Sequence, residues 1–279
     1  YIGGLIYNPP GGYSGYFDGS GDYLSIAYNS AFNYSSSSAF TFEFWFFPTV
    51  GSTDNSHIAA SQNGSVDANL NWLFRQTAAN KVRFVMIQSG GGVVANDSTD
   101  SFALNAWNHV AGVMTGSATK LWLNGIYQGS QTFNGSQQVN GNITIGYWTS
   151  YYTGYVSNAR YVSSQVYTGT SNFTPPNGPL QAISGTQLLT CAYSTFRDGS
   201  TNNFTITVNG NTAVSTQNPF PLNTLPNPAL GNQGNGVYSM SQYQSLKQQG
   251  LWPAIDPYWR YVTMMLHGNG TNGAQNNTF

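Results

Sequence analysis

Carboxylate side chains are scarce in this chain, and the few present do not form a hydrolytic pair. The chain has one glutamate, Glu43, which lies between phenylalanines in a predicted strand. Hydrolysis of a glycosidic bond needs two carboxyl groups on either side of that bond. A lone acid on a sheet instead needs a cationic partner, for which we consider Arg75, Arg83 and Arg160. The carboxylates therefore favour a protein that is not an enzyme.

Histidine and cysteine also give no catalytic arrangement. The three histidines are His57, His109 and His267, and no Gly-x-Ser-x-Gly motif accompanies them. We interpret His109 as a structural residue of its strand. The single cysteine, Cys191, allows neither a disulfide within the chain nor a cysteine-based zinc site.

The low content of charged residues limits the kinds of partner that the chain can bind. Charged residues make up 6% of the chain, against roughly 25% in ordinary soluble domains. The eight basic residues are scattered and the formal net charge is −1, which disfavours nucleic acid as a partner. No apolar run approaches the roughly 20 residues that span a bilayer, so we expect no membrane segment.

Aromatic residues at alternating positions predict many short strands. In the clearest one, residues 40–47, four phenylalanines share one face, and we expect a central strand. Asn124-Gly125 predicts a two-residue hairpin, because both residues tolerate positive φ. A second hairpin is predicted around residues 207–211. Further strands are predicted at residues 70–75, 81–88, 107–114, 120–123, 126–127, 143–147 and 155–161.

Five motifs follow one another between residues 15 and 160. They are the segment 15–26, the aromatic strand 40–47, Trp107-Asn108-His109-Val110-Ala111, Leu121-Trp122-Leu123-Asn124-Gly125, and Ile145-Gly146 followed by the segment 154–160. Together they resemble a laminin G-like module of the concanavalin A-like lectin and glucanase type, over residues 13–166. The resemblance implies an all-β, concanavalin A-like jelly-roll β-sandwich.

The rest of the chain predicts three parts. We expect the sandwich over residues 1–222, a linker with one short helix over 223–258, and a strand extension over 259–279. Residues 170–279 resemble the tails of tandem modules in marine phage and other environmental structural proteins. The segment Met264-Met265-Leu266-His267 looks like the opening strand of a following module. We therefore predict that it completes a neighbouring subunit's sandwich, giving a head-to-tail filament.

One loop carries aromatic side chains suited to sugar binding. Trp148, Tyr151 and Tyr152 lie between two predicted strands, and exposed aromatic loops commonly mark recognition sites. Packing between subunits is the alternative explanation for this loop. Glu43 is a further candidate contact to a glycan.

The resemblance also implies a possible metal. Laminin G-like relatives often bind Ca²⁺ at a rim loop, and the matching residues are Asp18 and Asp22, together with Asn142. The alternative is that the two aspartates cap tight turns. No other cofactor is required.

Two functions remain open. The first is a non-catalytic structural or adhesive subunit of a phage fibre or extracellular filament, which binds copies of itself and surface glycans. The second is a glycan-binding lectin module of a larger secreted protein. Either predicts an extracellular or virion-surface location.

Overall fold

The computed structural model of the protein describes residues 12–51, 56–88, 90–136 and 139–220. The predicted linker with its helix, at 223–258, and the predicted strand extension, at 259–279, lie outside the described residues.

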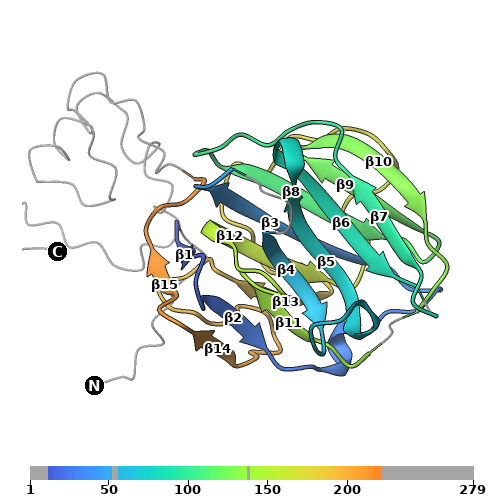
Figure 1. Ribbon diagram of the computed structural model, residues 1–279, viewed down its shortest axis with the longest axis horizontal. Coiled ribbons are helices and arrows are strands. Elements are labelled where there is room, and N and C mark those ends of the chain that lie inside the picture. The colour runs from blue at the N-terminus through green and yellow to red at the C-terminus, as the bar shows by residue number, and fades with distance from the viewer. Residues whose placement is uncertain (1–11, 52–55, 89, 137–138, 221–279) are drawn as a thin grey trace, which may run out of the picture. The chain divides into compact units, whose positions relative to one another are not determined.

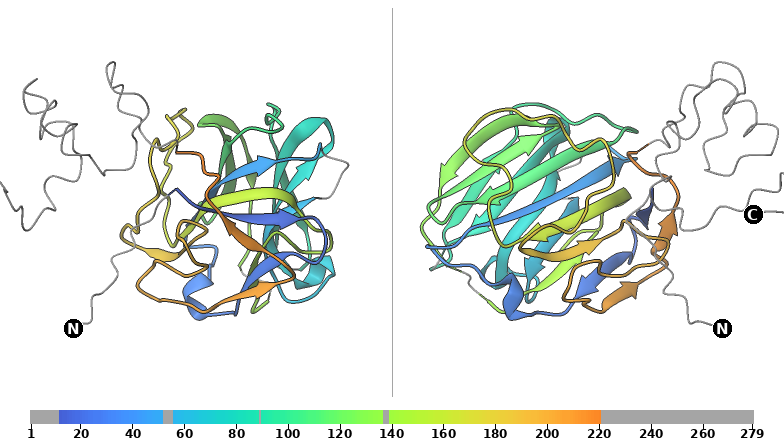
Figure 2. Two further views of the ribbon diagram at one scale, coloured as in Figure 1. Left: turned by 90° about the vertical axis from the view of Figure 1, so that its left-hand side faces the viewer. Right: turned by 180° about the vertical axis from the view of Figure 1, so that it is seen from behind.

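Two antiparallel sheets form a sandwich (Figures 1 and 2). The first, sheet A, has the order β10-β9-β8-β3-β12-β1-β15, with β13 also paired to β12. Its strands are β1 (Ser14–Asp18), β3 (Phe40–Pro48), β8 (Asn108–Met114), β9 (Ala118–Leu123), β10 (Ile126–Thr132), β12 (Thr153–Val162), β13 (Thr186–Thr190) and β15 (Ala213–Ser215).

The second, sheet B, has the order β14-β2-β11-β4-β5-β6-β7. Its strands are β2 (Tyr23–Ile26), β4 (His57–Gln62), β5 (Leu70–Thr77), β6 (Lys81–Ile87), β7 (Val93–Asp97), β11 (Asn142–Ile145) and β14 (Ile206–Asn209). The helical elements within the described residues are the 3-10 turns η1 (Ser30–Phe32), η2 (Asp67–Asn69) and η3 (Ala78–Asn80), and none could cross a membrane. The predicted all-β jelly-roll sandwich is confirmed.

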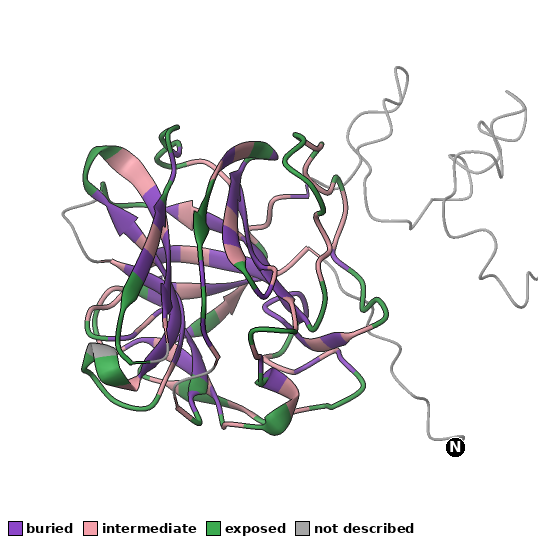
Figure 3. Ribbon diagram, turned by 90° about the vertical axis from the view of Figure 1, so that its right-hand side faces the viewer, coloured by how far each residue is buried: buried purple, intermediate pink, exposed green. Residues whose placement is uncertain are grey.

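Aromatic side chains fill the space between the two sheets. The predicted central strand is β3, and the side chains of Phe40, Phe42, Phe44 and Phe46 have no exposed surface. They face Trp72 and Phe74 of β5, with ring centroids of Phe42 and Trp72 4.8 Å apart. Full burial of such a side chain stabilises the fold by about 1.5–3 kcal/mol. Figure 3 shows burial concentrated along the strands and exposure in the connections.

One predicted hairpin is confirmed and the other is wrong. Asn124 and Gly125 have φ of 52° and 77° between β9 and β10, as the predicted turn requires. By contrast, β14 pairs with β2 in sheet B, whereas β15 pairs with β1 in sheet A. The chain therefore crosses between the sheets after Asn209. Pairing of β14 with β2 and of β15 with β1, both far away in the sequence, prevails over the local turn signal.

The connection at residues 163–185, between β12 and β13, crosses the outer face of sheet A (Figure 2, right). The indole N–H of Trp122 donates to the carbonyl of Ser171, at 3.0 Å. The backbone N–H of Phe173 donates to the carbonyl of Gly125, at 2.8 Å. The rings of Tyr167 and Phe173 stack with centroids 3.9 Å apart. The connection is thus fixed to strands of the sheet beneath it.

Gly125 is predicted to tolerate no side chain. A Cβ on this residue would lie 2.0 Å from the carbonyl oxygen of Phe173, and its φ is 77°. We expect Gly125→Ala to lower the free energy of unfolding by at least about 2 kcal/mol, measured by urea denaturation. Gly178→Ala is the matched control, because a Cβ there meets nothing within 4 Å. Equal stability of the two variants would contradict this description of the turn.

Candidate functional site

The side chain of Glu43 is buried on the outer side of β3. It has no exposed surface. Its Oε1 accepts bonds from Nε and Nη2 of Arg160, at 3.0 and 2.6 Å. Its Oε2 accepts the hydroxyl of Tyr167 at 2.6 Å and lies 3.2 Å from Nε2 of His109. Of the three arginines considered, Arg160 is therefore the partner.

These contacts determine the charge of Glu43 and exclude its predicted contact to a glycan. Burial alone would raise the pKa of this carboxyl group, but the bonds from His109 and Tyr167 and the charge of Arg160 outweigh it and lower the pKa to about 2. The carboxylate is therefore ionised, satisfied and inaccessible. The prediction that it holds a glycan is wrong, because no atom of it reaches the surface.

The predicted aromatic loop is only partly available to a ligand. The side chain of Tyr152 has no exposed surface and packs edge to face on Phe17 in the core, so its predicted role as a sugar contact is wrong. Trp148 is 8% exposed, and its indole N–H donates to the carbonyl of Gly64 at 2.9 Å. Trp148 is therefore packed onto sheet B and is not the exposed stacking ring that was predicted.

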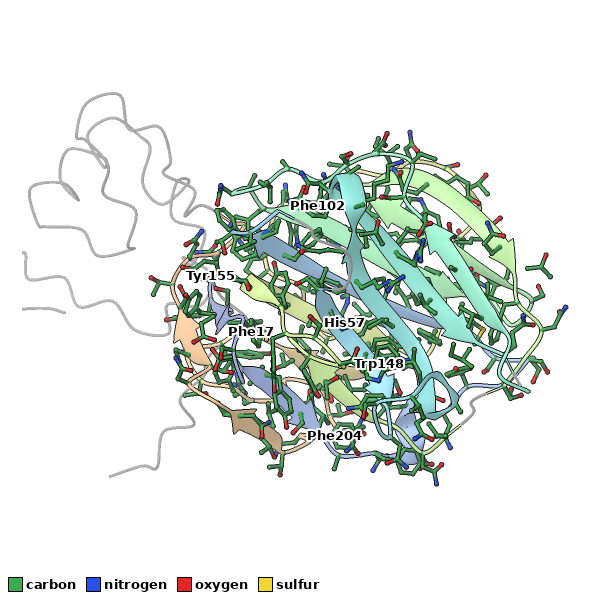
Figure 4. The ribbon with its side chains drawn as sticks, in the orientation of Figure 1. Phe17, His57, Phe102, Trp148, Tyr155 and Phe204 are labelled. Atoms are coloured by element: carbon green, nitrogen blue, oxygen red, sulfur yellow. The ribbon has the colours of Figure 1, made fainter. Side chains whose placement is uncertain are left out.

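His57 fixes this loop to β4. Its Nδ1 accepts the backbone N–H of Ser150 at 3.1 Å, and its ring packs edge to face on Trp148, with centroids 5.2 Å apart. Figure 4 shows His57 and Trp148 side by side. Burial, together with the nearby charge of Arg75, lowers the pKa of His57 to about 4. The ring is neutral at pH 7, and the loop depends on that neutral form.

Three tyrosines gather on the outer face of sheet B, where this loop meets β2. The rings of Tyr147 and Tyr151 stack with centroids 4.6 Å apart, and Tyr23 lies 5.0 Å from Tyr147. All three side chains are half-buried. We call Tyr23, Tyr147 and Tyr151 the tyrosine cluster. Burial, reinforced by the other two phenols, raises the pKa of Tyr147, so its hydroxyl group is neutral.

Polar side chains flank the tyrosine cluster. Asn209, on the edge strand β14, is paired with Tyr23 in the ladder. Its amide lies 3.3 Å from the hydroxyl oxygen of Ser25, which is the next outward-facing residue on β2. The cluster therefore combines ring faces with amide and hydroxyl groups, the combination that holds small polar ligands in one orientation.

The turn from Asp18 to Asp22 adjoins the cluster and is braced internally. Asp22 has no exposed surface, and its two oxygens accept the backbone N–H groups of Asp18 and Asn211, at 3.1 and 2.7 Å. Asp18 accepts the N–H of Ser20 at 2.7 Å. These bonds match the turn-capping alternative. Ca²⁺ at this turn remains a prediction.

Asn142 is too far from this turn to share a metal with it, so that part of the calcium prediction is wrong. Ile143 pairs with Ile26 and Ile145 with Leu24, which places Asn142 at the far end of β2 from Asp22. Five strand positions separate them, roughly 16 Å at about 3.3 Å per residue. The amide oxygen of Asn142 instead accepts the N–H of Tyr28, at 2.9 Å.

An apolar hollow of about 130 Å³ lies on the same outer face of sheet B. Trp148 forms part of its wall, and Arg75 and Arg83 are also among its lining residues. Its apolar lining also includes Leu73, Val85, Ile87, Val93 and Ala95. Trp148 thus links the hollow to the loop that carries the tyrosine cluster.

A second group of aromatic side chains lies on sheet A. Tyr16, Tyr155, Phe47 and Trp107 are neighbours across β1, β12, β3 and the start of β8, with successive ring centroids 5.0, 5.8 and 5.5 Å apart. We call them the aromatic row. Phe47 packs edge to face with both neighbours, and all four side chains are half-buried.

Only part of this site was predicted from the sequence. Tyr151, a predicted glycan contact, lies in the tyrosine cluster, whereas Tyr23 and Tyr147 were not predicted as site residues. Alternation along β2 would have placed Tyr23 opposite the buried Leu24 and Ile26. Nothing in the sequence shows that Tyr147 faces outward. The predicted assembly strand, Met264, Met265, Leu266 and His267, lies outside the described residues.

The chain has recognisable relatives. Residues 18–168, more than half of its length, match the family described as the concanavalin A-like lectin/glucanases superfamily. No curated protein matches the sequence.

Solved structures resemble it in fold alone. The native heptameric SAP-like pentraxin of Limulus polyphemus has a TM-score of 0.51 at 10% identity, over 73% of this chain and 94% of that one. A proposed carbohydrate binding protein of Bacteroides ovatus ATCC 8483 has a TM-score of 0.49 at 17% identity, over 76% of this chain and 62% of that one.

Glu43 is predicted to be a main source of acid sensitivity. In the folded protein the pKa of this carboxyl group lies below its ordinary value of 4.5. Its contribution to the free energy of unfolding is therefore complete above pH 4.5 and is lost as pH falls toward 2. We expect Glu43→Gln to cost roughly 3 kcal/mol at pH 7, because Arg160 stays buried without its counter-charge. The control is Asp97→Asn, in the exposed pair with Arg83, which should cost at most about 1 kcal/mol. Chemical denaturation that gave similar costs for both variants would contradict the assigned network.

His57 is predicted to act at milder acidity. The unfolded state takes up its proton near pH 6.5 and the folded state only near pH 4. Stability should therefore fall by roughly 3 kcal/mol between these values and stop falling, from this source, below pH 4. Denaturation at several pH values should show a smaller decline for His57→Gln than for the natural chain. Identical declines would show that His57 is not held neutral.

Proposed function

The chain belongs to the concanavalin A-like lectin/glucanase superfamily, and on that basis we propose that it is a non-catalytic glycan-binding module whose tyrosine cluster contacts the sugar. The observation that carries the proposal is the half-buried, stacked tyrosine group on the outer face of sheet B, flanked by Asn209 and Ser25. A pyranose ring presents an apolar C–H face and a rim of hydroxyls. Ring faces suit the first, and amide and hydroxyl groups suit the second.

The state of the carboxylates supports binding without hydrolysis. Glycosidases use two carboxyl groups that reach the bond from opposite sides. The carboxylates whose contacts are described each have structural partners, as the bonds to Glu43, Asp18, Asp22, Asp97, Asp100 and Asp198 show. Near the tyrosine cluster, Asp22 is fully buried and engaged by backbone N–H groups.

We propose an extracellular location for this module. The low share of charged residues and the abundance of polar uncharged ones support it, as does the kind of ligand. Assembly into a fibre or filament stays a prediction, since it depends on residues 259–279, which the described structure does not include.

The proposal predicts that Tyr151→Ala weakens glycan binding. Losing about 60 Å² of ring face from the contact, at about 25 cal/mol/Å², corresponds to about a 10-fold weaker Kd. The measurement is a glycan array, to find a ligand, followed by calorimetric titration of both proteins with it.

Tyr28→Ala is the matched control for this experiment. Tyr28 is also a half-buried tyrosine but follows the opposite end of β2 from Tyr23, so its removal should leave Kd unchanged. Near-ultraviolet and far-ultraviolet circular dichroism would verify that both variants fold. A ligand bound equally well by the natural chain and Tyr151→Ala would refute the proposed site. A chain that binds no glycan on the array would refute the proposed function.

A further inference from the structure

The hollow on sheet B is a separate feature from the tyrosine cluster, and no part of the proposed sugar contact explains it. From its size, lining and position we infer that it receives a small apolar substituent of the glycan, such as the methyl end of an acetamido group. The inference rests on the proposed function and specifies its ligand: sugars that carry an acetyl or methyl substituent are preferred over those that carry only hydroxyls.

The size of the hollow fits a substituent and excludes a whole sugar. Its volume is about 130 Å³. An apolar cavity of about 150 Å³ holds one benzene molecule, and pockets that enclose complete small-molecule ligands start near 300 Å³. An acetyl or methyl group therefore fits within the space, while the sugar ring that bears it stays outside.

The lining of the hollow favours a methyl group over a hydroxyl. Val85 and Ile87 of β6 and Leu73 of β5 form its floor and are at most 6% exposed. At its wall, the indole N–H of Trp148 is already used by the carbonyl of Gly64. Hydroxyl groups placed against this floor would lose bonds to water, whereas a methyl group loses none.

The charge of Arg83, beside the hollow, does not indicate an anionic ligand. Arg83 makes two side-chain bonds to Asp97, through Nε and Nη2, so that its charge is compensated within the sheet. The pair is exposed, which screens it further. The charge of Arg83 therefore gives no reason to expect a carboxylate or a phosphate here.

The position of the hollow connects it to the proposed sugar contact. Trp148 lines the hollow and directly follows Tyr147 in the chain. The bond from the backbone N–H of Ser150 to His57 fixes the loop that carries both residues. Val93, on the last strand of the sheet, is 56% exposed at the hollow, which leaves an apolar approach from solvent. A ligand on the tyrosine cluster can thus extend along one face into the hollow.

The test uses pairs of oligosaccharides that differ in one substituent of one residue: N-acetylglucosamine in place of glucose, N-acetylgalactosamine in place of galactose, and D-fucose in place of D-galactose. Titration calorimetry would give the ratio of Kd values within each pair. We expect the substituted member of at least one pair to bind about 10-fold more tightly, as burial of one such group implies. Ala95→Leu, which fills the hollow, should bring that ratio close to one without weakening the unsubstituted sugar.

Two further variants separate the possible outcomes. Ser130→Leu adds the same side chain to an exposed position of β10, outside the hollow, and should keep the preference. Tyr151→Ala should weaken both members of each pair. Equal binding within every pair, or a preference that survives Ala95→Leu, would overturn the inference while leaving the proposed function in place. Failure of every sugar to bind would overturn both.

Discussion

The arrangement of sheet A depends on the ion pair and hydrogen bonds of the Glu43 carboxylate. It lies on the central strand and joins β12 through Arg160, β8 through His109 and the 163–185 connection through Tyr167. A buried charge of this kind is tolerable only when each of its partners is present. The connection is therefore held against the sheet by the bond from the hydroxyl of Tyr167 to this buried ion pair. Stacking of Tyr167 on Phe173, and the turn at Gly125, extend the same attachment toward β9 and β10.

This attachment makes the two outer faces of the sandwich different. On sheet A the connection packs on Trp122 of β9, and the aromatic row lies on β1, β12 and β3. On sheet B the outer face carries the tyrosine cluster and the hollow, joined by a loop that His57 and Trp148 fix in place. The chain thus uses its few ionisable groups to organise its structure, and its uncharged aromatic and amide groups form the surface that we propose for binding.

The fold was largely predictable from sequence, and the site was not. Alternation in residues 40–47 identified the central strand, because four phenylalanines on one face must be buried, and Asn124-Gly125 identified a turn that only a few residue pairs can form. The hairpin at 207–211 failed because pairing with distant β1 and β2 decided which sheet each strand joined. Trp148, Tyr151 and Tyr152 are equivalent in a sequence reading, yet one lines a hollow, one stacks at the surface and one is in the core. Their directions depend on packing, which local pattern does not encode. The sequence likewise left three arginines as partners for Glu43, and only the pairing of β12 with β3 selects Arg160, more than a hundred residues later.

The central claim is that a sugar lies on the outer face of sheet B at the tyrosine cluster. A crystal structure of the protein with its tightest-binding oligosaccharide tests it most directly. The predicted result is a sugar ring packed against Tyr147 or Tyr151, with hydroxyls bonded to Asn209 or Ser25. A sugar bound instead on the aromatic row of sheet A, or anywhere else away from the cluster, would contradict the claim.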